Sequence, residues 1–150
     1  MRFVVIGGVA ERLLGSPRGT GDIDICPATD VPNLGRLAEV LNDLGAAFRP
    51  QGLEAGFPQP EPWKALSFDA FTGLALTTRH GWLDLWFRPD GTKGFTDLVE
   101  NAIELEVSGF RIHVASLDDI IRNKEAVGGL KYLSHLPLLR ELRERRARDA

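Results

Sequence analysis

The chain alternates short segments of strand-like pattern with segments of helical pattern. Runs rich in β-branched and aromatic residues, or with a period of two, predict strands. These runs lie at residues 3–6, at residues 22–26, at residues 74–87 (two strands joined by a turn near His80 and Gly81) and at residues 103–115 (a hairpin with Gly109 in its turn). Strands are therefore expected in four separate parts of the chain.

Helices are predicted where apolar residues recur every three or four positions. Such segments cover residues 9–14, 33–44, 96–102, 119–127 and about 131–148, the last with an interruption before Pro137. Asp30 and Ser116 are suited to cap the second and fourth of these helices. Because strands and helices are mixed along the chain, we expect an α+β fold: one two-layer domain over residues 1–150, with helices packed on a mixed β-sheet and a C-terminal helical segment over 116–150.

One segment, residues 45–64, has no regular pattern and carries four prolines and three glycines. A span of this length without secondary structure is either a functional lid or a mobile connector. The sequence does not choose between the two.

Composition excludes several classes of protein. Hydrophobic residues make up 43% and charged residues 26% of the chain, as in ordinary globular domains, and a net charge of −3 does not indicate a general nucleic-acid-binding surface. A single cysteine, Cys26, excludes an internal disulfide. The first apolar run is too short for a signal peptide, and no segment approaches the roughly 20 apolar residues of a membrane span. We therefore expect a cytoplasmic protein with no membrane partner.

Two aspartates on one predicted strand are the first candidate chemistry. Side chains alternate across a strand, so Asp22 and Asp24 share one face while Ile23 and Ile25 share the other. Two carboxylates held side by side repel each other unless a cation lies between them or one is protonated. The pair is typical either of a divalent-metal site, because Mg²⁺ prefers oxygen ligands, or of a solvent-facing strand with two acids.

A pair of glycines, Gly7 and Gly8, favours the metal interpretation. They stand where the first strand runs into a helix, and there free backbone N–H groups attract phosphate and missing side chains allow a close approach. Taken alone, a Gly-Gly pair is more often a tight turn than a phosphate cradle. Gly15 and Ser16 are a second such dipeptide, but they close a helix instead of opening one. A phosphate cradle and two carboxylates separated by one short helix are the two halves of a nucleoside triphosphate site.

The same residues resemble a known superfamily. The segment GGVAERLLGSPRGTGDIDICP resembles the signature of nucleotidyltransferases of the DNA polymerase β superfamily, in which Gly-Gly or Gly-Ser precedes Asp-x-Asp. More narrowly, it is similar to the stand-alone AbiEii-like class, many members of which are toxins of bacterial toxin–antitoxin systems. The resemblance covers most of the 150 residues and implies a nucleotidyltransferase-type fold.

Two further site residues follow from the resemblance. The segment LTTRHGWLDLWF is similar to the strand pair that delivers a third carboxylate, here Asp84, and the segment from Val114 to Leu142 is similar to a helical region that supplies a lysine, here Lys124. An acid among large apolar neighbours is costly unless it is paired, and an exposed or salt-bridged acid is the alternative. Lys124 suits a triphosphate as a point charge, and is otherwise an ordinary surface lysine.

The turn before the paired aspartates adds Arg18 and Thr20. A guanidinium in this turn can grip a phosphate with two hydrogen bonds, while a solvated turn explains the same residues. The sequence also departs from its relatives in two places. Residues 129–132 replace an Arg-Pro-Lys-Asp stretch, and the chain begins almost at its first strand, where relatives usually have a helix.

The resemblance implies a function as well as a fold. It implies a transferase that moves a nucleoside monophosphate from an NTP such as ATP to a hydroxyl of a tRNA 3′ end or of a protein, with an antitoxin protein as partner. The catalytic residues, which would hold two Mg²⁺ ions, are Asp22, Asp24 and Asp84. The residues implied in nucleotide binding are Gly7, Gly8, Arg18, Thr20 and Lys124. The alternative is a non-catalytic domain of the same fold that binds a nucleotide or a partner protein. The two departures favour this alternative, and the intact Asp22, Asp24 and Asp84 argue against it.

Overall fold

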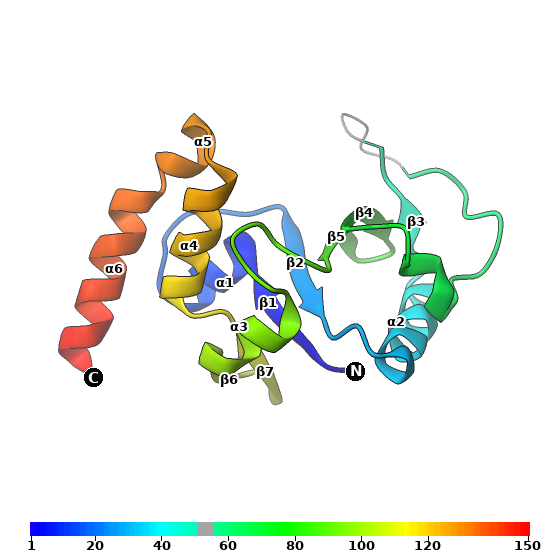
Figure 1. Cartoon of the computed structure of the whole chain (residues 1–150), viewed down its shortest axis with the longest axis horizontal. Coiled ribbons are helices and arrows are strands. Elements are labelled where there is room, and N and C mark those ends of the chain that lie inside the picture. The colour runs from blue at the N-terminus through cyan, green and yellow to red at the C-terminus, as the bar shows by residue number, and fades with distance from the viewer. Residues whose placement is uncertain (51–55) are drawn as a thin grey trace.

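A mixed β-sheet runs through the middle of the protein, with helices around it (Figure 1). The structure is a computed structural model that describes residues 1–50 and 56–150. Its strands are β1 (Phe3–Ile6), β2 (Asp22–Pro27), β3 (Ala47–Phe48), β4 (Gly73–Thr78), β5 (Gly81–Trp86), β6 (Ile103–Val107) and β7 (Phe110–Val114). They lie side by side in the order β3-β4-β5-β2-β1-β7-β6.

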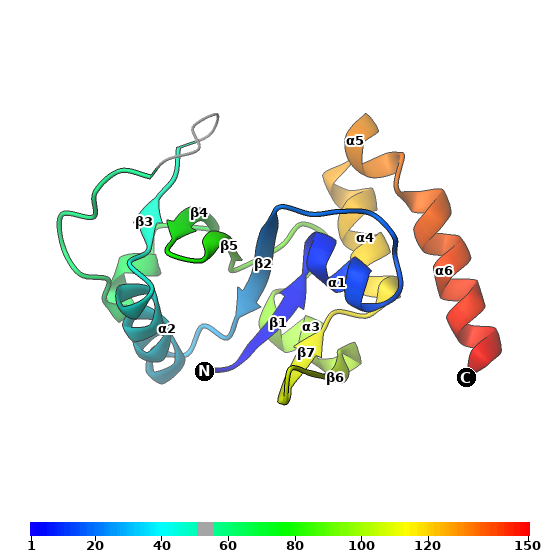
Figure 2. The same ribbon diagram turned by 180° about the vertical axis from the view of Figure 1, so that it is seen from behind.

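The helices are α1 (Gly7–Leu13), α2 (Val31–Asp43), α3 (Phe95–Asn101), α4 (Leu117–Val127), α5 (Leu130–Leu133), α6 (Leu136–Asp149) and the short 3₁₀ helix η1 (Ala65–Phe68). α2 lies at one end of the molecule and α4, α5 and α6 lie at the other, with α3 below the middle of the sheet (Figures 1 and 2). α2 and η1 pack together beside β3 and β4, whereas α4 is in contact with α1, α5 and α6. Among the described residues, no helix combines the length and the apolar character needed to cross a lipid bilayer.

The pairing of the central strands brings the predicted aspartates of β2 and β5 together. β1 is antiparallel to β2, and β2 is parallel to β5, so β2 and β5 both begin at the end of the sheet where β1 finishes. In this register Asp24 lies opposite Ile6 of β1 on one side and opposite Asp84 of β5 on the other.

The core follows the predicted hydrophobic spacing. α2 buries Leu34, Leu37 and Leu41 on one face, at intervals of three and four residues, and caps its start with Asp30, whose side chain accepts a hydrogen bond from the Asn33 backbone N–H. The inner strands contribute side chains of 5% exposure or less, among them Val4, Val5, Ile25, Leu76, Leu85 and Val114. The apolar pattern therefore fixes which face of each element turns inward.

The expected α+β fold with a mixed sheet is confirmed, and each predicted strand and helix is present with bounds shifted by a few residues. α1 begins at Gly7, so the two glycines form its first turn instead of preceding it. The last predicted helix is interrupted at Ser134 and His135, before Pro137, as expected. The segment 45–64 is not wholly irregular, because β3 pairs with β4, and residues 51–55 of it lie outside the described part of the chain.

Candidate active site

Three carboxylates meet at the end of the sheet where β2 and β5 begin. Asp22 and Asp24 alternate with Ile23 on β2, and the parallel register sets Asp84 directly beside Asp24. Ligand oxygens of Asp22, Asp24 and Asp84 all lie within 4.8 Å of one another. This spacing brings together the three acids that the sequence predicted, and it suits the oxygen ligands of a divalent cation.

The electrostatics of this cluster reflect its crowding. Burial first, and then the charge of Asp22, raise the pKa of Asp24 to about 6. Burial, followed by a hydrogen bond with Asp22 and the charges of both other acids, raises the pKa of Asp84 to about 7. A cation placed among these oxygens would relieve the repulsion that adds to the effect of burial in both shifts.

Two side chains that the sequence analysis did not select contact the carboxylates directly. The Trp86 indole N–H donates to Asp24 Oδ1 at 3.1 Å, so this tryptophan on the face of β5 shared with Asp84 is part of the cluster. Arg49, just after β3, donates from Nη2 to Asp84 Oδ1 at 3.0 Å. Both contacts lower the pKa of the acid that they touch, and so oppose the effect of burial.

Gly7 leaves room for the carboxylates. Its φ of +66° favours glycine, and a Cβ at this position would come within 2.6 Å of Asp24 Oδ2. A Cβ at Gly8 would instead come within 2.7 Å of Thr20 Oγ1. The absence of side chains therefore first serves the packing of α1 against the acidic strand and the turn before it, a reason that the sequence did not indicate.

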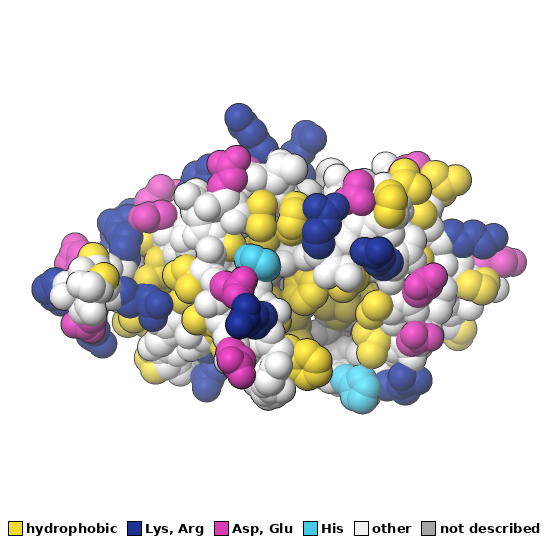
Figure 3. All heavy atoms as spheres, turned by 90° about the horizontal axis from the view of Figure 1, so that it is seen from below, with side chains coloured by type: hydrophobic (Ala, Val, Ile, Leu, Met, Phe, Trp, Pro, Cys, Tyr) yellow, Lys and Arg dark blue, Asp and Glu magenta, His cyan; other side chains and the backbone are white. Residues whose placement is uncertain are grey.

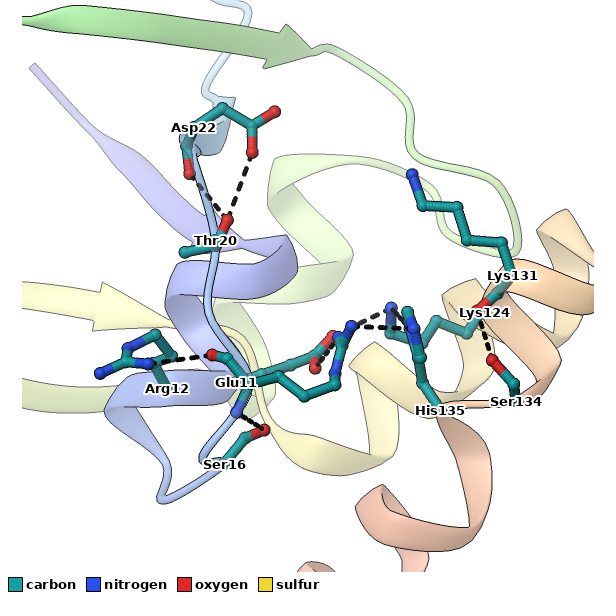
Figure 4. A network of polar contacts seen from close by, with 10 residues as sticks. Glu11, Arg12, Ser16, Thr20, Asp22, Lys124, Lys131, Ser134 and His135 are labelled. Carbon is teal, nitrogen blue, oxygen red and sulfur yellow. Dashed lines mark hydrogen bonds and ion pairs between the residues drawn. The ribbon is translucent and has the colours of Figure 1, made fainter.

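The turn before β2 is tied to the first acid. The Thr20 hydroxyl donates to the backbone carbonyl and to Oδ1 of Asp22, each at 3.3 Å. Thr20 thus lies beside the Asp22 carboxylate (Figure 4), and its hydroxyl is also the atom that a Cβ at Gly8 would meet.

Arg18 and Lys124, the two predicted phosphate-binding cations, converge on one buried carboxylate. Glu11 on α1 is 1% exposed; its Oε2 accepts from Arg18 Nη2 at 2.5 Å, and its Oε1 lies 2.9 Å from Lys124 Nζ (Figure 4). Two cations share one carboxylate here, so the cluster keeps a net positive charge. The Lys124 charge also reaches the acids, because it lowers the pKa of Asp24.

His135, between α5 and α6, completes this cationic cluster (Figure 4). Its Nε2 lies 2.8 Å from Arg18 Nη1 and its Nδ1 lies 3.3 Å from Lys124 Nζ. Burial, and then the positive charges of Arg18 and Lys124, lower the pKa of His135. The imidazole therefore stays neutral near neutral pH and can accept a hydrogen bond from one of the two cations.

The stretch that departs from the family pattern also lies against Lys124. The Lys124 ammonium is 5.1 Å from the centroid of the Tyr132 ring, and the Lys131 ammonium is 5.4 Å from the same centroid. An aromatic face flanked by two ammonium groups stabilises positive charge. Residues 129–132 thus still contribute to the cationic side of the site.

A separate groove lies at the other ends of the same strands. It has a volume of about 660 Å³ and is lined by residues that follow β2 and β5, among them Thr29, Phe87 and Arg88. Seen from below, hydrophobic side chains gather around a hollow with basic side chains near its rim (Figure 3). None of the three carboxylates is among the residues that line this groove, so the groove is not part of the acidic cluster.

Comparisons with known proteins connect this geometry with a class of fold. No protein-family model and no curated protein matches the sequence. Among solved structures, the chain is similar to the lincosamide antibiotic adenylyltransferase LnuA in its lincomycin-bound form, with a TM-score of 0.58 and 13% identity over 93% of this chain and 86% of that one. A candidate nucleotidyltransferase from Thermotoga maritima aligns with 99% of this chain and 80% of its own, at 18% identity and a TM-score of 0.47. The chain therefore has an α+β fold of the nucleotidyltransferase kind.

Besides Trp86, sequence reasoning missed three residues of the site, for reasons that differ. Glu11 occupies a buried position of a helix on which an acid is unexpected, and this mismatch was an available signal. Arg49 lies in a proline- and glycine-rich segment with no periodicity, and His135 has no ligand-like spacing. Only the tertiary structure brings these last two to the charges that they contact.

Replacing Glu11 by Gln should destabilise the protein strongly. The change leaves Lys124 buried without its counterion, and breaking a buried ion pair in this way costs about 3–5 kcal/mol. Urea denaturation followed by circular dichroism measures the loss. Glu141→Gln is the matched control, because Glu141 pairs with Arg145 on the exposed face of α6, where such a pair contributes less than about 1 kcal/mol. Equal effects of the two substitutions would contradict the central role given to Glu11.

The metal-free protein should lose stability as the pH rises from about 4 to about 7. The folded state keeps protons on Asp24 and Asp84 that the unfolded chain, with a pKa of 3.8, has already released. The stabilisation is complete below the unfolded value and is lost as the pH passes the folded values. Denaturation curves in EDTA measure this decline, which Asp84→Asn should reduce and Mg²⁺ should flatten. A decline of the same size in wild type and Asp84→Asn would show that other groups cause it.

Proposed function

We propose that this protein transfers a nucleoside monophosphate from an NTP to an acceptor hydroxyl and releases pyrophosphate. The observation that carries the proposal is the convergence of Asp22, Asp24 and Asp84 within 4.8 Å at the start of two parallel strands. The nucleotidyltransferase-type fold supports this reading, as does the cationic cluster around Glu11 on the neighbouring helix.

The donor set fits Mg²⁺. All three candidate ligands are carboxylates. Burial first, and then the charge of the neighbouring acids, raise the pKa of Asp24 and of Asp84, and a divalent cation would offset the second of these effects. Bound there, Mg²⁺ supplies Lewis-acid activation of the acceptor hydroxyl and neutralises charge on the triphosphate. Asp22 and Asp24 are the ligands proposed for the triphosphate-bound ion, and Asp84 adds the ligand for a second ion on the acceptor side.

The cations of the Glu11 cluster are the groups proposed to hold the triphosphate. Arg18 presents a planar fork of N–H donors and Lys124 presents a compact charge, so the two can contact different phosphate oxygens. Gly7, Gly8 and Thr20 would line the nearby stretch of backbone that the triphosphate approaches. In the reaction, the acceptor oxygen bonds to the α-phosphorus, the bond from that phosphorus to the bridging β-phosphate oxygen breaks to release pyrophosphate, and the proton of the acceptor hydroxyl passes to the solvent. The protein contributes chiefly positioning and charge stabilisation.

The proposed acceptor is a hydroxyl of a tRNA 3′ end or of a protein, in keeping with the resemblance to AbiEii-like toxins. In that case an antitoxin protein would be the cognate partner. A small-molecule hydroxyl is the competing acceptor, since the structural neighbour LnuA is an adenylyltransferase for lincosamide antibiotics.

Labelled nucleotides distinguish these acceptors. The purified protein is incubated with each α-labelled NTP and Mg²⁺, together with total RNA, with a protein extract or with lincomycin. We expect label from one NTP to enter RNA or protein, and EDTA to prevent it. Label in lincomycin alone would replace the toxin assignment with that of an antibiotic-modifying enzyme, and label in none of these acceptors would leave the non-catalytic alternative.

Asp84→Asn should separate chemistry from binding. Two carboxylates suffice for a cation on the triphosphate, so calorimetric NTP affinity should stay within about threefold of wild type. The rate of transfer should fall by about a thousandfold or more, because Asp84 serves only the acceptor-side ion. The matched control is Asp69→Asn, an isosteric loss of one charge at an exposed position outside the cluster. Near-normal transfer by Asp84→Asn would refute its catalytic role.

A further inference from the structure

Arg49 is held rigidly beside the acidic cluster. It follows β3 directly, and its backbone N–H donates to the Ala75 carbonyl at 2.9 Å, which extends the pairing of β3 with β4 by one bond. Its side chain is only 12% exposed, and its Nη2 reaches Asp84 Oδ1 at 3.0 Å. The guanidinium thus starts from a fixed strand end and points at one specific carboxylate.

Packing on the other side of the guanidinium restricts it further. The Arg49 guanidinium carbon lies 4.2 Å from the ring centroid of Trp82, close enough for a strong cation–π interaction. Its Nε is buried and has no hydrogen-bond acceptor among the described residues. Arg49 therefore acts on the acidic cluster chiefly through the Nη2 donor that contacts Asp84.

We propose that Arg49 is the built-in countercharge of Asp84 and controls how many divalent cations the acidic cluster binds in the absence of nucleotide. Three carboxylates lie together, and Arg49 neutralises the one nearest to it. A guanidinium in contact with a ligand oxygen opposes a metal ion at that oxygen, both by its charge and by occupying the lone pair.

An order of binding follows. Asp22 and Asp24 have no arginine in contact with their carboxylates among the described residues, so a first cation binds there. A second cation at Asp84 requires the contact with Arg49 to break. The acceptor-side ion therefore binds after the first ion, so the acidic cluster does not hold both cations before the substrates are bound. This inference rests on the proposed function only in taking the three carboxylates as cation ligands.

Binding of Mn²⁺ without nucleotide tests the inference directly. Electron paramagnetic resonance of free Mn²⁺ gives the number of bound ions and their affinity for wild type, Arg49→Met and a control. Wild type should bind one ion. Arg49→Met should bind a second ion, and its overall Mn²⁺ affinity should rise by about tenfold, because one unit of opposing charge is removed next to a ligand.

The control is Arg111→Met, which removes the same charge from the same sheet. Arg111 lies on β7, is 79% exposed and pairs only loosely with Glu104 at 3.6 Å. Its loss should change Mn²⁺ affinity by less than about twofold, since exposed charges far from a site are screened by salt. Adding Asp84→Asn to Arg49→Met should abolish the second ion.

Different results of the Mn²⁺ experiment would contradict the inference about Arg49 and the proposed function. Unchanged stoichiometry and affinity in Arg49→Met, or weaker binding, would overturn the inference; weaker binding would instead make Arg49 a residue that orients Asp84. Arg49→Gln gives the same comparison if Arg49→Met does not fold. A wild-type protein that binds no Mn²⁺ would count against the proposed function itself, so the two failures can be told apart.

Discussion

Mutual repulsion among three carboxylates is the constraint around which this structure is organised. The parallel pairing of β2 with β5 fixes Asp24 opposite Asp84, and the alternation of β2 adds Asp22 to the same face. Like charges at this spacing are tolerated only with protons, cations or hydrogen-bond donors nearby. The protein supplies donors from two directions, the Trp86 indole and the Arg49 guanidinium, and both lower the pKa of the acid that they contact. Burial, followed by the charges of the neighbouring acids, outweighs them, so the pKa values of Asp24 and Asp84 remain raised.

An excess of positive charge lies around Glu11, one helical turn after Gly7 on α1. There Glu11 faces two cations, and the remaining positive charge is shared with a neutral imidazole and an aromatic ring. The acid-rich and cation-rich clusters come from elements joined by the short turn that contains Thr20. A complex of a divalent cation with a polyphosphate carries both positive and negative charge. A site with an acidic cluster beside a cationic cluster is complementary to such a complex.

The pattern of the sequence predicted the local part of this arrangement and missed the long-range part. Alternation placed Asp22 and Asp24 on one face, and helix caps such as Asp30 and Ser116 marked true helix starts, because these features depend on neighbours in the chain. The pairing of Asp84 with Asp24 depends on the register of two strands about 60 residues apart in the chain. Asp84 was therefore assigned to the site from the resemblance and not from the pattern of residues. Arg49 could not be assigned at all, because its role arises from β3 joining the sheet at the end of an irregular segment.

The burial of Glu11 and Lys124 argues that their charges serve more than stability. A well-packed apolar pair of similar volume is often as stabilising as a buried ion pair, or more so, because neither partner has to lose its hydration. This site keeps two charged side chains of 1% and 8% exposure and adds Arg18 to the same carboxylate. Such an arrangement fixes the positions of two cationic groups while leaving an excess of positive charge. That excess of positive charge suits an anionic ligand, and the neighbouring acidic cluster could hold a cation. The two clusters together therefore favour a ligand that brings its own metal ion over either a simple anion or a bare cation.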